Sequence, residues 1–432
     1  MRFLRWFYPG VGVKRWLVLF SLGVFLIAAG LAVAVDAHVL GQLEEGMRNL
    51  TMAATGRFIS RAVRGAFLAA VGAAMAFVAV QRIVRTIILG VLPAGISSIA
   101  DTIYHRRQLA RGPRVVALGG GTGLSVLLRG LKEYTSNITA IVTVTDDGGS
   151  SGRLREEMGV LPPGDIRNCL VALADAEPTM QKLFQYRFKG GRLDGHSFGN
   201  LFIAAMSELT GDFEEAVRES SRVLAIRGRV LPSTTSKVVL NAEFEDGTSA
   251  YGETTISKSF KPIRRIFLQP EEGNDVRALP DAVEAIGAAD LVILGPGSLF
   301  TSVIPNLAVG DLADAIRETP APVVYIVNVM TQPGETDGLD AAGHVRAVVD
   351  QLGPGSVDYV IVPGDALAPE RLRAYDDQGA HPVTIAPRSL DDLRVKTVRA
   401  QVIAATGLVR HDPDRLAKAA LRLAEVNRSV VR

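Results

Sequence analysis

An uncharged apolar segment near the N-terminus constrains this chain more than any other feature of its sequence. No charged residue occurs from Trp16 to Val35, and Ser21 is the only hydroxyl-bearing side chain in that stretch. A run of about 20 apolar residues matches the helical length that crosses the hydrocarbon core of a bilayer. A signal peptide is the alternative, because Lys14 and Arg15 precede the run, but the run is longer than an ordinary signal core and no convincing cleavage site closes it. We therefore predict a membrane-spanning helix over about 16–35.

A second apolar run, Gly65–Val80, is shorter and rich in alanine. It spans a bilayer, over about 65–82, only if it tilts, thins the membrane or lets its flanking arginines snorkel, so an interfacial or re-entrant helix is the alternative. Basic residues precede the first run and follow the second, which favours both termini on the cytoplasmic side. We predict a helical hairpin in the cell membrane, with the lipid bilayer as a partner and the main domain in the cytoplasm.

Charge and cysteine content exclude several classes of protein. The 47 basic and 45 acidic side chains leave a formal net charge of +2, which argues against a dedicated nucleic-acid binder. The only cysteine, Cys169, rules out an intramolecular disulfide and a multi-cysteine metal site. A reducing compartment fits this composition.

Beyond the N-terminal region, short β-branched runs alternate with amphipathic stretches. This alternation predicts a Rossmann-like α/β fold, with a mostly parallel sheet and helices on both faces. We assign residues 1–112 to the membrane anchor and a juxtamembrane linker, and residues 113–432 to the α/β domain. A small antiparallel insertion is expected over about 237–269. The predicted parallel strands are Arg114–Leu118, Ala140–Thr145, Asp290–Leu294, Val323–Asn328 and Asp358–Val362, and the predicted insertion strands are Lys237–Glu245, Ser249–Thr255 and Ile263–Gln269.

A glycine-rich turn follows the first predicted strand and opens a helix. Such a turn aims free backbone N–H groups at a phosphate, and glycine allows the close approach. Leu124 stands where a dinucleotide fingerprint has its third glycine, so a simple strand-to-helix turn is the alternative and an NAD-linked oxidoreductase is disfavoured. The predicted phosphate-binding residues are Gly119, Gly120, Gly121, Thr122 and Gly123.

Two adjacent carboxylates, Asp146 and Asp147, follow the second predicted strand. In a Rossmann-like fold an acid at this position binds ribose hydroxyls, and a carboxylate pair can instead hold Mg²⁺ beside a diphosphate. An ordinary turn before a solvated helix is the alternative. The neighbouring candidates for ligand binding are Gly148, Gly149, Ser150, Ser151 and Arg153.

Two later helix starts carry polar side chains that we also assign to the site. Asp165 lies where a carboxylate caps a helix, and Arg167 and Asn168 follow in its first turn. His196 and Asn200 open another helix, and a lone histidine is more often structural than catalytic.

Further strands also end in small, polar, glycine-bearing loops. Parallel strands end at one edge of the sheet, so these loops predict a single crevice that takes a nucleotide-like ligand. Their candidate residues are Gly295, Pro296, Gly297, Ser298, Thr331 and Gln332.

These motifs, in this order, resemble the YvcK (gluconeogenesis-factor) family within the superfamily of the phospholactate transferase CofD. The likeness runs from about Arg114 to Thr384. The motifs that carry it are Gly119–Ser125, Thr145–Arg155, Pro162–Asn168, Gly195–Asn200, Gly295–Ser298 and Asn328–Glu335.

The resemblance implies a Rossmann-like, cytoplasmic protein that binds UDP-sugars such as UDP-N-acetylglucosamine. It also implies a role in gluconeogenic growth, cell shape and cell-wall precursor supply, with cell-wall synthesis or metabolic proteins, or a second copy of the chain, as partners. Our first hypothesis is a non-catalytic regulator. The alternative is a Mg²⁺-dependent transferase acting on a nucleotide-diphosphate-linked substrate. In that case Asp146 or Asp147 holds the metal, His196 assists proton transfer, and His196 and Asp147 are the candidate catalytic residues.

The sequence departs from the family pattern in two places. The apolar hairpin is a departure from the soluble members. Leu339 stands where many members carry a tyrosine, which affects one expected contact to the sugar nucleotide.

Overall fold

The computed structural model describes residues 14–35, 60–91, 99–175, 178–273, 275–365, 367–376, 378–385 and 390–430. The chain forms two compact units, Met1–Ile103 and Tyr104–Arg432. The domain boundary that we placed at residues 112–113 stays a prediction.

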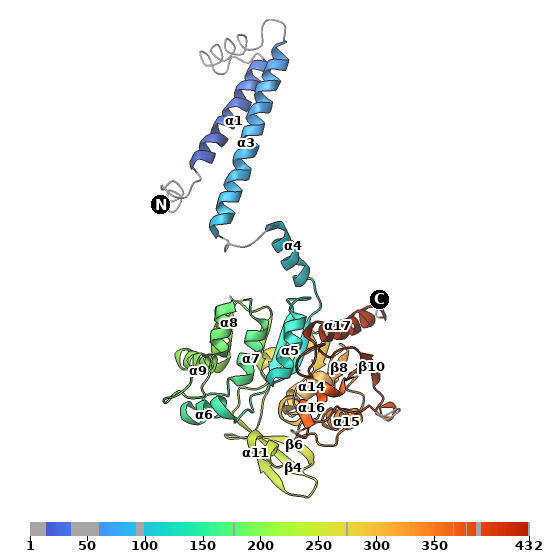
Figure 1. Ribbon diagram of the computed structural model, residues 1–432. Helices are drawn as coiled ribbons and strands as arrows, with labels where there is room; N and C mark the ends of the chain where they lie inside the picture. Colours follow the sequence, from blue (N-terminus) through green and yellow to red (C-terminus); the bar gives the residue numbers. More distant parts are fainter. Residues whose placement is uncertain are drawn as a thin grey trace. The chain divides into compact units, whose positions relative to one another are not determined.

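In the first unit, helices α1 (Lys14–Val35) and α3 (Arg61–Val91) lie side by side (Figure 1). Within them, Lys14–Ala34 and Ala62–Thr86 are 21 and 25 residues long, and both are long and apolar enough to cross a membrane. The second helix therefore extends beyond the predicted 65–82. Arginine is a good helix former, so Arg82 and Arg85 continue the helix rather than end it.

Glycines bring α1 and α3 into close contact. A Cβ added to Gly23 would lie 2.7 Å from the carbonyl oxygen of Gly72, and one added to Gly30 would lie 2.6 Å from that of Gly65. The two glycines of each helix are seven residues apart, so they share one face. Small residues at such positions let helix backbones approach closely in lipid, where the hydrophobic effect supplies no attraction.

The second unit contains a seven-stranded sheet in the order β10-β9-β8-β7-β1-β2-β3, and all its neighbouring strands are parallel. This confirms the predicted Rossmann-like class. The strands are β1 (Val115–Gly119), β2 (Ile138–Val142), β3 (Arg229–Pro232), β7 (Leu291–Leu294), β8 (Val323–Ile326), β9 (Tyr359–Pro363) and β10 (Lys396–Ala400).

Alternating residues of the buried strands pack into two hydrophobic cores, one on each face of the sheet. In β1, Val115 and Ala117 pack on the face covered by α5, α7 and α17, while Val116 and Leu118 pack on the face covered by α12, α14 and α15. Strands buried on both sides need this double set of apolar residues. The helices are α4 (Ile99–Ala110), α5 (Gly121–Leu131), α6 (Gly149–Met158), α7 (Gly164–Leu173), α8 (Pro178–Gln185), α9 (Phe198–Thr210), α10 (Phe213–Val223), α12 (Pro280–Gly287), α13 (Ile304–Leu307), α14 (Gly310–Glu318), α15 (Ala341–Leu352), α16 (Pro369–Asp376) and α17 (Pro413–Val430).

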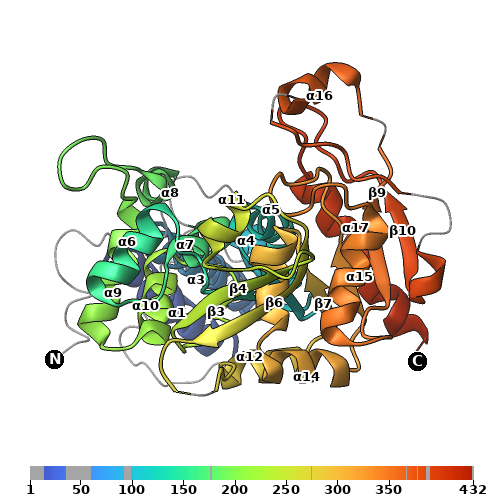
Figure 2. The same cartoon turned by 90° about the horizontal axis from the view of Figure 1, so that it is seen from below.

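Helices α6, α8 and α9 gather at one end of the domain and α15, α16 and α17 at the other (Figure 2). The predicted antiparallel insertion is confirmed as a three-stranded sheet in the order β5-β4-β6, with β4 (Val238–Phe244), β5 (Ser249–Tyr251) and β6 (Ile263–Pro270). The prediction of a strand over Ser249–Thr255 was wrong at its end. Gly252 has a φ of +87°, which breaks the strand, and helix α11 (Glu253–Lys258) begins there.

Candidate functional site

The topology of the sheet creates a crevice between β1 and β7. From β1 the chain adds β2 and β3 on one side, and then crosses to β7, β8, β9 and β10 on the other. Loops that leave two adjacent strands in opposite directions open a gap at the carboxyl ends of those strands, which is where open α/β sheets bind ligands.

A cavity of about 600 Å³ lies at this point. Its size is typical of small-molecule sites. Four of the predicted loops or helix starts contribute to its wall, namely those that follow β1, β7 and β8 and the first turn of α7. The predicted residues that line it are Gly120, Gly121, Thr122, Gly123, Asn168, Pro296, Gly297, Ser298, Thr331 and Gln332.

Two glycines of the first loop are required by close packing. A Cβ on Gly120 would lie 2.4 Å from Oδ2 of Asp165, and a Cβ on Gly123 would lie 2.6 Å from the carbonyl oxygen of Pro296. Helix α5 begins here after Gly120, which has no side chain to cap it, and the Asp165 carboxyl group accepts the N–H of Gly121. Its first turn therefore presents backbone N–H groups and the positive end of the helix dipole to the cavity.

The loops after β7 and β8 hold each other in place. The Gln332 side chain donates through Nε2 to Oγ of Ser298 at 2.7 Å, and Asn328 donates through Nδ2 to the carbonyl oxygen of Gly297 at 2.8 Å. Because the amide groups cross from one loop to the other, this side of the cavity is preorganised.

Sequence reasoning missed several residues of the cavity wall, including Arg129, Tyr375, Arg410 and His411. Burial lowers the pKa of Arg129, and the nearby charge of Arg410 lowers it further. Within the described residues neither arginine has a carboxylate partner, so both are free to meet an anion. Arg129 follows the glycine turn by two helical turns, which is a usable sequence signal, whereas nothing local marks the three C-terminal residues.

A second group of predicted residues forms a hydrogen-bonded network rather than part of the cavity wall. Arg167 donates to Oδ1 of Asn200 at 2.9 Å and to Oγ of Ser197. Ser150 Oγ lies 3.1 Å from Nδ1 of His196, and Asn200 donates to Oγ of Ser151 at 3.4 Å. The network joins the N-termini of α6, α7 and α9.

Arg153 donates to the carbonyl oxygen of Asp194 at 2.7 Å. Burial, and then the charge of Arg153, lower the pKa of His196. A buried, neutral His196 held by a hydrogen bond to Ser150 fits a structural role in this network. Its catalytic role stays a prediction.

The two adjacent carboxylates face different partners. Asp146 accepts the N–H of Gly148 at 2.9 Å, which closes a local turn. Asp147 accepts the N–H and the hydroxyl of Thr254, at 2.9 and 2.6 Å, and so caps α11 of the insertion. Neither lines the cavity, but Asp146 lies beside Asp165, which abuts the cavity at Gly120.

Several carboxyl groups lie close together beside the cavity, and two of them, Asp165 and Glu253, have raised pKa values. Burial, and then the charge of Asp146, raise the pKa of Asp165 to about 7, although the N–H of Gly121 and the charge of Arg167 act in the opposite direction. Burial and four surrounding carboxylates raise the pKa of Glu253 well above its ordinary value. In the described part of the chain no three His, Cys, Asp or Glu side chains are arranged to hold a metal. A Mg²⁺ ion here would need ligand phosphate oxygens to complete its shell, which is its usual habit.

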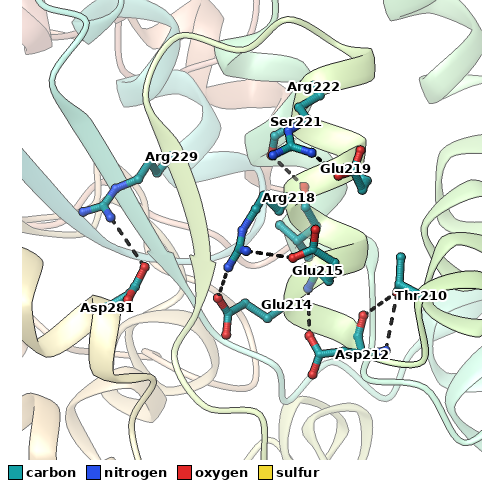
Figure 3. Close-up of polar contacts among 11 residues, drawn as sticks. Thr210, Asp212, Glu214, Glu215, Arg218, Glu219, Ser221, Arg222, Arg229 and Asp281 are labelled. Carbon is teal, nitrogen blue, oxygen red and sulfur yellow. Dashed lines mark hydrogen bonds and ion pairs between the residues drawn. The ribbon is translucent and has the colours of Figure 1, made fainter.

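Two smaller hollows, of about 400 and 300 Å³, lie at the amino ends of β1, β2 and β3. Their arginines are already paired. Arg218 contacts Glu214 at 2.6 Å, and Arg229 lies 3.6 Å from Asp281 (Figure 3). Open α/β sheets bind ligands at the carboxyl ends of their strands, whereas these hollows lie at the amino ends and their charges are already paired. They are therefore weaker candidates for a ligand-binding site than the cavity between β1 and β7.

Comparison with known proteins agrees with this assignment of the fold. The sequence profile of the CofD family, described as 2-phospho-L-lactate transferase CofD, matches residues 115–403. The gluconeogenesis factor of Bacillus subtilis is 49% identical over 307 residues, which is 71% of this chain and 96% of the relative. A crystal structure of a UPF0052-family protein from Bacillus halodurans superimposes with a TM-score of 0.69 and 47% identity, and covers 72% of this chain and 99% of that one.

Longer relatives also exist. A protein of Nostoc sp. that is provisionally named as a gluconeogenesis factor is 47% identical over 425 residues. The match covers 98% of this chain and 92% of the relative. The N-terminal region is therefore shared with some relatives and is not peculiar to this chain. Leu339, the other departure, packs against the hydrophobic core beside α15 and does not line the cavity.

Proposed function

Since the chain belongs to the CofD family, and within it to the gluconeogenesis-factor (YvcK) branch, its role is related to gluconeogenesis, and we propose that it acts by binding a nucleotide sugar of the UDP-N-acetylglucosamine type. Occupancy of the site would then regulate gluconeogenic growth, cell shape and cell-wall precursor metabolism through protein partners. Two apolar N-terminal helices fit an anchor in the cell membrane, with the domain on the cytoplasmic side.

The observation that carries the proposal is the cavity between β1 and β7. It combines the N-terminus of α5 with Arg129 and Arg410, which is a suitable environment for a diphosphate. It also offers the neutral polar groups of Asn168, Gln332 and Tyr375. A volume of about 600 Å³ suits a ligand with a base, a diphosphate and a sugar.

Mg²⁺ is part of the proposal as a companion of the diphosphate. Asp146 is the better candidate ligand of the two, because it lies beside Asp165 at the cavity, whereas Asp147 accepts two hydrogen bonds from Thr254 of α11. Bound there, the ion would neutralise phosphate charge beside the carboxylates.

A transferase is the second candidate, and the buried carboxyl groups favour it. Asp165 has a pKa of about 7 and lies against the glycine turn, so it could exchange a proton near neutral pH. The matching family profile is that of a transferase. A transferase would release a nucleoside monophosphate when given a nucleotide-diphosphate-linked substrate, an acceptor hydroxyl and Mg²⁺.

The deciding experiment is calorimetric titration of the full-length chain in detergent with UDP-N-acetylglucosamine, with and without Mg²⁺. The same mixtures are then assayed for products. Binding without turnover is expected. Release of nucleoside monophosphate would replace the regulator with the transferase, and absence of binding would overturn the nucleotide-sugar assignment.

A further inference from the structure

Two buried hydrogen-bond acceptors beside the cavity have no donor among the described residues. Gln332 uses Nε2 to hold Ser298, which leaves its Oε1 unpartnered. His411 is 9% exposed, and its Nε2 is also buried and unpartnered. Both residues belong to the wall of the same cavity.

The protonation of His411 is determined by its surroundings. The ring makes a hydrogen bond to the backbone carbonyl of Val327, directly after β8, and because Nε2 has no partner we assign this bond, and the ring proton, to Nδ1. Burial lowers the pKa of His411 to about 4, which leaves the ring neutral at pH 7. Nε2 is then an acceptor only, as is an amide oxygen.

A buried acceptor without a donor costs free energy, and such groups in native structures call for an explanation. His344 on α15 provides a comparison, because its Nδ1 contacts the carbonyl oxygen of Asp340 at 2.9 Å and its Nε2 is likewise buried and unpartnered. His344 does not line the cavity, however. The position of His411 against the cavity therefore distinguishes it from a histidine that is merely buried in the fold.

We propose that His411 Nε2 and Gln332 Oε1 together recognise a hydrogen-bond donor of the bound ligand, a hydroxyl or an amide N–H. A phosphate or carboxylate oxygen placed there would put acceptor against acceptor. This part of the wall therefore selects the neutral, donor-bearing portion of the ligand, while the N-terminus of α5 with Arg129 and Arg410 takes the anionic portion. The inference rests on the proposed nucleotide-sugar function and names two recognition residues for it.

The test compares full-length variants by titration with UDP-N-acetylglucosamine in detergent. His411→Phe keeps the ring but removes the acceptor, and His411→Gln puts an amide oxygen near the position of Nε2. His344→Phe is the matched control for loss of a buried imidazole. We expect His411→Phe to weaken binding about tenfold or more, His411→Gln to recover most of the loss, and His344→Phe to bind as the unmodified chain does.

Each remaining outcome speaks against the inference. If His411→Phe folds, by circular dichroism, and binds with unchanged affinity, the inference is wrong while the nucleotide-sugar function stands. An equal loss in His344→Phe would show that the effect is general destabilisation. Failure of the unmodified chain to bind would remove the function, and with it the inference.

Discussion

At the residue scale, the site depends on a close approach of the glycine-rich backbone before α5 to a buried carboxyl group. Gly120 brings the backbone against the carboxyl group of Asp165, and that carboxyl group accepts the N–H of Gly121 at the start of α5. A carboxyl group in this position competes with a bound phosphate for the same helix terminus when it is ionised, and stops competing when it is protonated. The protonation state of Asp165 therefore affects how well this helix terminus can bind a phosphate.

Asp165 predicts a pH dependence of stability. Its pKa is about 7 in the folded chain and near 3.8 when unfolded, so the folded state binds more protons between these values. The free energy of unfolding should consequently fall as the pH rises from about 4 to about 7, by up to about 1.4 kcal/mol per pH unit. Urea denaturation followed by circular dichroism, without Mg²⁺, measures it.

Asp165→Asn is the control for this prediction, because an amide oxygen can still accept the N–H of Gly121 but cannot titrate. The difference in stability between the variant and the unmodified chain should grow as the pH rises. A difference that stays constant from pH 5 to pH 8 would contradict the raised pKa.

At the element scale, helix α11 joins the insertion to two loops of the site. Asp147, after β2, accepts from Thr254 at the start of α11, and Glu335, after β8, accepts from Ser257 at 3.0 Å. The sequence alone predicts that Asp147→Ala weakens nucleotide binding far more than folding. Because the Asp147 carboxylate caps α11, we now expect that substitution to reduce stability as well.

Thr254→Val tests the link between α11 and the loop after β2. The substitution keeps the shape of the side chain and removes the hydroxyl that donates to Asp147, so the free energy of unfolding should fall by about 1–2 kcal/mol. Thr255→Val is the matched control, since Thr255 is the exposed neighbour. Equal effects of the two substitutions on urea denaturation would show that the hydrogen bond contributes nothing.

The helical hairpin makes a second prediction at this scale. Gly23→Leu and Gly30→Leu place side chains where the backbone of α3 lies, so α1 and α3 should separate. Ala28→Leu places the same side chain at an exposed position and should leave them together.

Spin labels on cysteines introduced at Val18 and Phe77, both exposed, report the distance between the helices. Cys169 is fully buried and stays unlabelled. The distance distribution should broaden and lengthen in the glycine variants alone. An unchanged distribution in Gly23→Leu would mean that the glycines do not determine the contact.

At the scale of the whole molecule, the chain combines an apolar hairpin with a domain that relatives possess without it. The Bacillus halodurans structure covers 99% of its own chain and only 72% of this one, so the α/β domain has a counterpart that folds by itself. We expect a chain lacking residues 1–103 to move from the membrane fraction to the soluble fraction and to keep its ligand affinity. Retention of the shortened chain in carbonate-washed membranes would contradict the anchor.

The class of fold and most of the loops that form the cavity could be predicted from the sequence alone. Buried parallel strands need runs of apolar residues, and the turns after β1 and β7 need glycine, so both leave local patterns that can be read directly. The two edge strands of the parallel sheet, β3 and β10, escaped prediction. In β10, Lys396 and Arg399 interrupt the apolar pattern because an edge strand is half solvated, and in β3 the exposed Arg229 and the terminal Pro232 leave an apolar run of two residues.

Which polar side chains contact one another could be learned only from the folded chain. The ligand contacts predicted for Ser150, Arg167, His196 and Asn200 stay predictions, and the structure shows that these residues also belong to a hydrogen-bonded network that connects three helix starts. His411 and Arg410 carry no local signal, and they reach the cavity because the segment before α17 returns to the carboxyl end of β8. Periodicity and turn chemistry act over neighbouring residues, whereas a binding site is made by contacts between residues hundreds of positions apart, and packing alone selects those contacts.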